Sequence, residues 1–172
     1  MEQVTFKDIK KSKEVNAYIY KRQQHAGGCW VIRIIPQNMQ LKVSSMAGKI
    51  LECLGYGGHT VELAKIAGYM HDIGNCVNRL DHPHSGALMA HQILRDMKMD
   101  YEDIAVIINA IGMHDEKSGG AVDTVSAALI LADKTDVRRD RVRNQNKAAF
   151  DKHDRVNYAV VSSYSIFRKR KR

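Results

Sequence analysis

Three ionisable side chains extend apolar helical stripes by one further step along the same face: His71, His114 and Asp133. Spacings of three and four residues keep each of them on the core-facing side of its helix. A buried, unpaired carboxylate costs several kcal/mol, so an inward Asp133 needs a cation. A metal ion shared with His71 and its neighbour Asp72 would supply one. Taken singly, each side chain also fits a hydrogen-bonded core residue or a polar residue turned to solvent, and only the joint pattern favours a metal.

The elements that must position these side chains are helices. Apolar residues recur at i, i+3, i+4 and i+7 in several segments, which is the pattern of core-facing helices. Strict alternation is rare and there is no internal repeat. The sequence therefore predicts an all-α bundle, in one domain of residues 1–172 with its core at about 43–140. The helices are expected within 7–25, at about 43–55, between Gly58 and Gly74, and at about 86–97, 104–112 and 125–136.

Size and composition exclude several classes of protein. A chain of 172 residues suits a single domain with one hydrophobic core. No apolar run approaches the roughly 18–20 residues that span a bilayer, and the N-terminus has no signal-peptide pattern. We therefore expect a cytoplasmic protein without membrane insertion. Cys29, Cys53 and Cys76 are odd in number and far apart, which argues against a disulfide framework or a thiolate zinc site.

The net charge of +8 comes from the C-terminal part of the chain. Residues 134–172 hold 13 Lys and Arg against 4 Asp and Glu, whereas residues 1–133 hold 14 against 15. Such a basic segment predicts an anionic partner, either a phosphorylated substrate or a nucleic acid. For the final five basic residues, 168–172, a solvated tail is the favoured interpretation.

Two short motifs resemble those of a known family. His71-Asp72-Ile73-Gly74-Asn75, preceded by Leu-Ala-Lys-Ile-Ala-Gly at 63–68, resembles the His-Asp doublet that names the HD-domain superfamily. Leu-Ala-Asp-Lys at 131–134 resembles the closing Ala-Asp motif of that superfamily. The resemblance covers roughly residues 43–140 and implies an HD-type helical bundle with metal-dependent phosphohydrolase activity. It implies that His71, Asp72 and Asp133 bind a divalent metal ion, for which Mn, Fe, Mg or Zn fit the mixed ligands.

A second set of histidines resembles one branch of the superfamily. His82-Pro83-His84-Ser85-Gly86 is similar to the His-Pro-x-x-Gly of HD-GYP proteins, and His114-Asp115-Glu116 is similar to their His-His-Glu. The resemblance places His82 and His114 at a second metal ion or at the substrate phosphate, and His84 outside the site. Asp115 stands where that branch has a second histidine, so one metal ion and two both remain open.

The chemistry that the resemblance implies is attack of metal-activated water on phosphorus. Asp72 would bridge metal ions or accept the proton of the water, and Lys134 would contact the phosphate beside Asp133. Arg79, Arg138 or Arg139 would add a phosphate contact, with solvent exposure as the alternative for each. The lysine that usually follows the family's His-Asp-x-Gly is Asn75 here.

The region before the doublet departs from the family. HD proteins supply a further histidine roughly where residues 38–40 stand, but this chain has none between His25 and His59. Codons for residues 30–42 can be chosen so that a shifted frame encodes histidines at the expected places. We hypothesise a local frameshift at about 29–42, and codons that cannot encode a histidine in the shifted frame would exclude it. If the run is genuine, the site lacks one ligand and residues 30–35 form an isolated strand or apolar flap.

Three functions are consistent with the sequence. The leading one is a metal-dependent phosphohydrolase that acts on a small phosphoester substrate such as a nucleotide. The second is a degenerate HD domain that binds a nucleotide or partner without turnover, which the absent histidine favours. The third is nucleic-acid binding through the basic C-terminal region, which lacks interleaved aromatic residues and a recognisable reader motif. The sequence leaves the substrate and the oligomeric state open.

Overall fold

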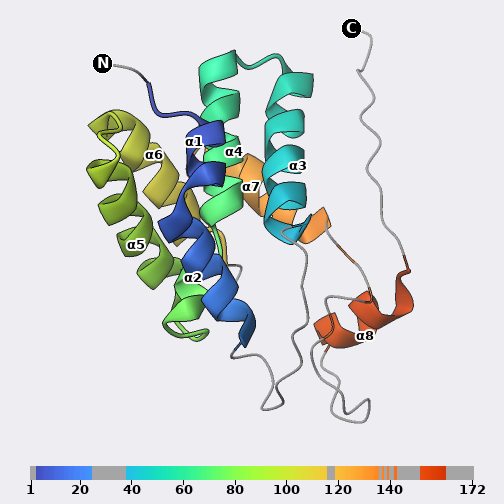
Figure 1. Ribbon diagram of the computed structural model, residues 1–172. Coiled ribbons are helices and arrows are strands. Elements are labelled where there is room, and N and C mark those ends of the chain that lie inside the picture. The colour runs from blue at the N-terminus through green and yellow to red at the C-terminus, as the bar shows by residue number, and fades with distance from the viewer. Residues whose placement is uncertain are drawn as a thin grey trace, which may run out of the picture.

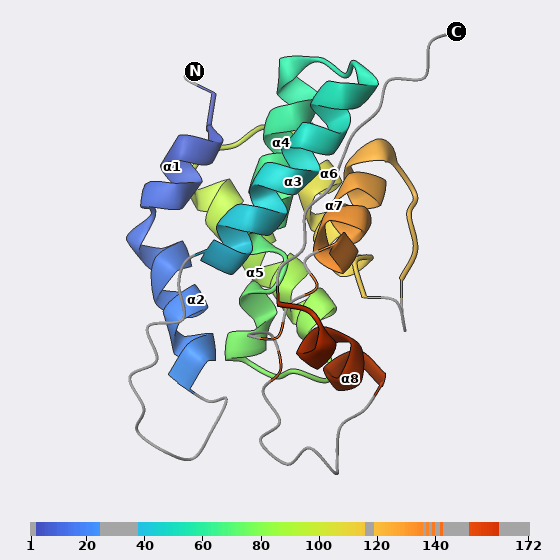
Figure 2. The same cartoon turned by 90° about the vertical axis from the view of Figure 1, so that its right-hand side faces the viewer.

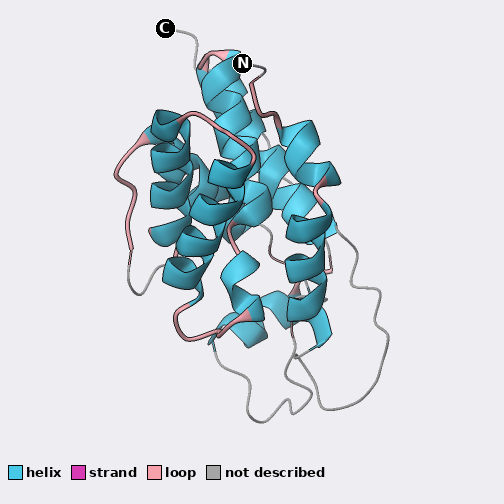
Figure 3. Cartoon of the chain, turned by 60° about the vertical axis from the view of Figure 1, so that its left-hand side comes forward, coloured by secondary structure: helices cyan, strands magenta, loops and turns pink. Residues whose placement is uncertain are grey.

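The computed structural model describes residues 3–24, 38–115, 119–135, 137, 139, 142 and 152–161. These residues form α-helices and one short 3-10 helix, with no strand among them, which confirms the predicted all-α class (Figure 3). No helix in these ranges combines the length and the apolar character needed to cross a bilayer. In chain order the elements are α1 (Phe6–Lys11), α2 (Lys13–Gln24), α3 (Asn38–Leu54), α4 (Gly58–Met70), η1 (Ile73–Cys76), α5 (His82–Asp96), α6 (Tyr101–Gly112), α7 (Thr124–Thr135) and α8 (Lys152–Ala159).

Helix α4 is the central element of the bundle. It packs against α3, α6 and α7, and α1 also contacts it (Figure 1). Small residues on α4 allow this close contact on several faces. Residues from every turn of α4 are buried: Val61, Leu63, Ala64, Ile66, Ala67, Gly68, Tyr69 and Met70. The C-terminal end of α4 is therefore buried, and the residues that follow Met70 (His71 and Asp72) lie inside the protein.

Helices α3 and α4 run antiparallel and approach closely, as Figure 2 shows. A Cβ atom added to Gly68 would lie 2.7 Å from the Cα of Ser44, and the Oγ of Ser44 donates a hydrogen bond to the carbonyl of Lys65. Four residues further along α3, Gly48 faces the side chain of Lys65. These contacts fix the register of the two helices: residue 48 lies opposite 65, and residue 44 opposite 68.

Two helices begin earlier than the sequence patterns predicted. Helix α3 starts at Asn38 rather than near Val43, so residues 38–42 continue the same helix. Helix α5 starts at His82 rather than near Gly86, with Pro83 in its first turn. Proline is compatible with the first turn of a helix because its missing N–H would have no partner there. The earlier start makes His82 a helical residue with a fixed direction.

The glycine of the His-Asp-x-Gly motif brings η1 against the beginning of α5. A Cβ atom on Gly74 would collide with the carbonyl of His82 and would lie 2.5 Å from the backbone nitrogen of Gly86. Only a residue without a side chain allows this approach. Gly74 therefore sets the distance between Asp72, at the end of α4, and His82, at the start of α5.

The N-terminal part forms two helices where the sequence predicted one short helix within residues 7–25. Helix α1 begins with a capping box in which Thr5 and Asp8 bond each other's backbone and side chain, and it ends at Ser12, whose backbone is extended. The ring of Phe6 meets that of Tyr69 edge-on, with centroids 5.8 Å apart. This contact fastens α1 to α4.

Several sequence-based predictions concern residues outside the described ranges. The expected strand or flap at 30–35, the frameshift segment up to residue 37, Arg138 and the basic run at 168–172 all fall there. Among the described residues that follow α7, Arg139 lies over the ring of Tyr158 in α8, 4.9 Å from its centroid.

Candidate metal centre

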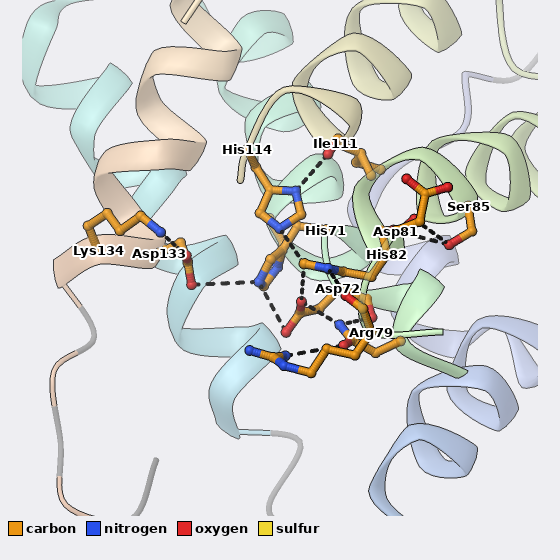
Figure 4. A network of polar contacts seen from close by, with 12 residues as sticks. His71, Asp72, Arg79, Asp81, His82, Ser85, Ile111, His114, Asp133 and Lys134 are labelled. Atoms are coloured by element: carbon orange, nitrogen blue, oxygen red, sulfur yellow. Dashed lines mark hydrogen bonds and ion pairs between the residues drawn. The ribbon is translucent and has the colours of Figure 1, made fainter. Parts of the chain in front are cut away.

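Five buried ionisable residues meet where the helix ends converge: His71, Asp72, His82, His114 and Asp133. The first two leave the C-terminal end of α4, His82 opens α5, His114 follows α6, and Asp133 lies in the last turn of α7. Figure 4 shows the three imidazole rings arranged around the carboxylate of Asp72, with Asp133 approaching from α7. The predicted convergence of distant helix ends is therefore present in the structure.

Asp72 lies between two of the histidines. Its Oδ2 is 3.6 Å from Nε2 of His71, and its Oδ1 is 3.4 Å from Nε2 of His82. On the other side of His71, the same Nε2 atom is 3.8 Å from Oδ1 of Asp133. The two oxygens of Asp72 thus face two different imidazoles.

The main chain holds all three rings in one tautomer. Nδ1 of each histidine bonds the carbonyl three residues earlier, at 2.8 Å for His71, 2.9 Å for His82 and 2.6 Å for His114. A carbonyl only accepts hydrogen bonds, so each Nδ1 carries the proton. In the neutral ring, Nε2 then carries a lone pair that points into the site. This arrangement is typical of a histidine that binds a metal through Nε2.

Acceptor atoms therefore face one another without a proton between them. Nε2 of His82 lies 3.3 Å from Nε2 of His114, and burial lowers the pKa of both rings below the usual 6.5, which disfavours their protonated forms. The nearby His71 lowers the pKa of His114 further, whereas the carboxylates of Asp72 and Asp133 raise it. Carboxylate oxygens complete the cluster. A bound cation would relieve this repulsion, so the donor set fits a divalent metal ion.

In the described part of the chain, one group of three side chains brings potential ligand atoms close enough together to hold a metal ion. Single donor atoms of His71, Asp72 and His114 all lie within 4.8 Å of one another. The sequence had assigned His114 to a second metal ion or to the phosphate, apart from His71 and Asp72. The structure places it beside them: the rings of His71 and His114 meet edge-on, with centroids 5.2 Å apart.

Asn75 is the residue of the site that sequence reasoning did not find. Its Nδ2 donates hydrogen bonds to Oδ1 of Asp72, at 2.7 Å, and to the backbone carbonyl of Asp72, at 3.0 Å. Nη1 of Arg79 then donates to Oδ1 of Asn75, at 3.3 Å. The sequence marks Asn75 only as a replacement for the family's lysine. Its spacing of three residues from Asp72, across the turn that η1 forms, was the available signal.

The remaining candidates differ in their distance from the cluster. Nζ of Lys134 lies 3.4 Å from Oδ2 of Asp133, and its side chain is 43% exposed. Arg79 is exposed; its guanidinium contacts Asn75, and its backbone carbonyl accepts the hydrogen bond from Nδ1 of His82. Arg139 donates its Nε–H to the carbonyl of Tyr158, which directs it to α8. Arg138 lies outside the described residues.

Two other histidines lie on the surface. His84 pairs with Asp81 at 2.5 Å, and both side chains are exposed, as expected for a histidine outside the site. Nδ1 of His59 accepts a hydrogen bond from Nε2 of Gln3, and Nε2 of His59 donates one to Oδ1 of Asp103. Neither contributes to the cluster.

Comparison with known proteins places the cluster in a family. The sequence matches the HD domain over residues 40–155, which is more than half of the chain. The chain belongs to the HD-domain family. The match begins at Gln40, the last of the positions 38–40 where the further family histidine was expected.

Two similar proteins agree with this assignment. Ribonuclease Y of Enterococcus faecalis (strain ATCC 700802 / V583) is 31% identical over 109 residues, which are 63% of this HD protein and 19% of that relative. The chain thus spans about a fifth of the length of the curated relative. A crystal structure of a predicted HD superfamily hydrolase from an uncultured Thermotogales bacterium superimposes with a TM-score of 0.54 at 19% identity, covering 88% of this chain and 86% of that one. The second likeness shows a shared fold.

Proposed function

We propose that this HD protein is a metal-dependent phosphohydrolase. The observation that carries the proposal is the cluster of three imidazole Nε2 atoms, in rings that bond the main chain through Nδ1, and of carboxylate oxygens at the convergent helix ends. Imidazole nitrogens and carboxylate oxygens are ligands that divalent metal ions take in proteins. Membership of the HD-domain family supports the same function.

In this proposal His71, Asp72 and Asp133 hold the ion, and His82 and His114 hold a second ion or the substrate phosphate. A divalent ion held by these residues would lower the pKa of a bound water and would neutralise phosphoryl oxygens. Asp72 faces both His71 and His82, so it is placed to bridge two ions or to accept a proton. Asn75 keeps the Asp72 carboxylate in that orientation. The metal is Mn, Fe, Mg or Zn.

Two basic residues are placed to contact phosphate. Lys134 follows Asp133 directly and its exposed side chain can turn from the carboxylate to a ligand without disturbing the core. Arg79 lies at the exposed end of the chain of hydrogen bonds that leads through Asn75 to Asp72. We assign Lys134 the main phosphate contact and Arg79 a secondary one, with Arg138 as a further candidate.

We propose a phosphoester, such as a nucleotide, as the substrate. The likeness to a protein named Ribonuclease Y makes RNA a second substrate to test, although that likeness covers only 19% of the relative. The basic C-terminal segment of 134–172 suits either anion. The cytoplasmic location stays a prediction.

A second candidate function is an HD domain that binds a nucleotide or partner without turnover. One observation favours it: residues 39 and 40 of α3 are Met and Gln, so in the described part of the chain no histidine of α3 joins the cluster. The two candidates agree on metal or ligand binding and differ in catalysis.

A metal add-back assay separates these candidates. The protein is stripped with a chelator and assayed with Mn²⁺, Fe²⁺, Mg²⁺ or Zn²⁺ against bis(p-nitrophenyl) phosphate, mononucleotides and a short RNA. We expect hydrolysis of at least one substrate that depends on the added ion. Ion binding without turnover of any substrate would favour the binding domain. Salt-sensitive RNA binding that disappears when residues 168–172 are deleted, with no bound metal, would instead favour the nucleic-acid-binding alternative.

A further inference from the structure

Gln40 carries a buried oxygen without a partner. It is the third residue of α3 and is 2% exposed. Among the described residues, its Oε1 is the one buried side-chain nitrogen or oxygen atom that lacks a hydrogen-bond partner. Leaving a buried acceptor unsatisfied is unfavourable, and such an atom in a folded protein needs an explanation. A ligand that the amide oxygen binds would provide one.

The register of α3 and α4 places Gln40 at the level of the metal centre. Residue 48 lies opposite 65, and residue 44 opposite 68, so the two helices pass each other in opposite directions. One further turn towards the start of α3 brings Gln40 level with His71 and Asp72. Gln40 precedes Val43 and Ser44 by three and four residues, and both are buried. It therefore belongs to the same interior face of α3.

Helix α3 also packs against α7, which carries Asp133. In Figure 4 the beginning of α3, in pale blue, lies in view beside the labelled Asp133 and Asp72, in agreement with this register. The unpartnered oxygen of Gln40 thus belongs to the same end of the bundle as the acceptor cluster. The amide oxygen of Gln40 adds one more hydrogen-bond acceptor to this end of the bundle, and a bound cation would stabilise all of these acceptors.

We propose that Oε1 of Gln40 binds the divalent ion held by His71, Asp72 and Asp133. This inference rests on the metal centre of the proposed function and adds a ligand to it. The amide oxygen takes the place for which the sequence supplies no histidine. A carbonyl oxygen suits harder ions such as Mn²⁺ and Mg²⁺, whereas imidazole suits Zn²⁺. Gln40 therefore shifts the preference of the site towards Mn²⁺.

A purely structural role for Gln40 makes the opposite predictions. If the amide only fills space in the core, replacing it by leucine leaves the affinity for metal unchanged, whatever its effect on the stability of the metal-free protein. If its oxygen is a ligand, leucine removes an unsatisfied acceptor, so the metal-free protein keeps or gains stability while the metal affinity falls. A fall in metal affinity without a loss of stability therefore occurs only in the second case.

The test uses the full chain and Mn²⁺ as the probe. Wild type, Gln40→Leu and Gln40→Glu are stripped of metal and titrated with Mn²⁺ by calorimetry, and water-proton relaxation reports how many water molecules contact the bound ion. We expect Gln40→Leu to weaken Mn²⁺ binding on the order of tenfold and to raise the relaxation rate, because water replaces the amide oxygen. Gln40→Glu keeps an oxygen ligand and adds a charge, so it should bind Mn²⁺ more tightly than wild type. Ser45→Ala, an exposed change on the same helix, is the control and should leave both readouts unchanged.

The results separate this inference from the proposed function. An unchanged affinity and relaxation rate in Gln40→Leu would overturn the role of Gln40 even if the wild type hydrolyses phosphoesters. The predicted changes in binding, together with no turnover of any substrate, would support the role of Gln40 and contradict the phosphohydrolase. Should Gln40→Leu fail to fold, tighter binding by Gln40→Glu supports the ligand, and weaker or equal binding overturns it.

Discussion

The metal centre has two unlike sides. The imidazole side consists of His71, His82 and His114, and each ring is held through Nδ1 by a backbone carbonyl three residues earlier. The α3–α7 side consists of Gln40 and Asp133, and of Lys134 next to Asp133. On the imidazole side, the main chain fixes the direction and the tautomer of each ring. On the α3–α7 side, the ligands that face the ion are determined by which side chains α3 and α7 carry. We infer that the imidazole side supplies a pre-organised frame and that the α3–α7 side tunes which ion binds.

The largest expected effect is that of Asp72→Ala, which removes the carboxylate that faces His71 and His82. Metal-dependent hydrolysis should fall about a thousandfold or more, because the bound ion contributes several kcal/mol to stabilising the transition state. Turnover of bis(p-nitrophenyl) phosphate measures the loss, and circular dichroism should show unchanged helical content. The exposed Asp81 provides the control, since Asp81→Ala should keep activity. Retained activity in Asp72→Ala would contradict the assignment of the site.

The next effect concerns the residue that orients Asp72. Asn75→Ala removes the 2.7 Å hydrogen bond to Oδ1 of Asp72 and should weaken Mn²⁺ binding roughly 10- to 100-fold, the usual range for partners that orient a ligand. Calorimetric titration of the stripped protein checks this. Gln92→Ala removes an amide from the exposed face of α5, and equal affinities of the two variants would show that Asn75 has no orienting role.

The alignment of α3 with α4, which places the beginning of α3 at the metal centre, can be disturbed by a substitution in α4. Gly68→Ala places a Cβ atom 2.7 Å from the Cα of Ser44, and neither backbone can yield without separating α3 from α4. We expect the free energy of unfolding to fall by about 1–3 kcal/mol. Gly112→Ala is the matched control, because its Cβ would make an ordinary 3.7 Å contact with Ala87. Chemical denaturation of both variants measures the difference, and an equally stable Gly68→Ala would show that the helices are not in this register.

The smallest effect is a dependence of stability on pH that belongs to the imidazole side. Burial lowers the pKa of His82 and His114 below 6.5, so the folded state binds protons on these rings less readily than the unfolded state. The free energy of unfolding of the metal-free protein should therefore fall as the pH drops below about 6.5. Thermal melts in chelator at pH 7.5 and 5.5 measure the fall. It should shrink in His114→Gln, and an identical fall in that variant would mean that other groups cause it.

The imidazole side could be predicted from sequence to a large extent, and the α3–α7 side only in part. The positions of His71 and His114 followed from helical spacing. Each lies three or four residues after a buried apolar residue of its helix, so its side chain is on the same, core-facing side. The early start of α5 at His82 did not, since proline in a first turn looks like a break until the helix is seen. On α7, Asp133 was found by the same stripe argument that found the histidines.

The role of Asn75 escaped prediction, and Gln40 was noted only as one of the positions, 38–40, where the family has a histidine. The contribution of Asn75 depends on a turn whose backbone brings its amide back to Asp72. That of Gln40 depends on how α3 and α4 are aligned, which Gly68 and Ser44 set by close contact. Neither arrangement is encoded in a local pattern. The family motif instead directed attention to a histidine that the chain does not have.

The central claim is that the two sides enclose one divalent ion. Crystals of the full chain grown with Mn²⁺ and measured near the manganese absorption edge give an anomalous difference map that locates the ion without assumptions about ligands. We expect the strongest peak within coordination distance, about 2.0–2.4 Å, of Nε2 of His71 and of carboxylate oxygens of Asp72 and Asp133. An anomalous peak elsewhere, or no peak between these three residues at saturating Mn²⁺, would contradict the account.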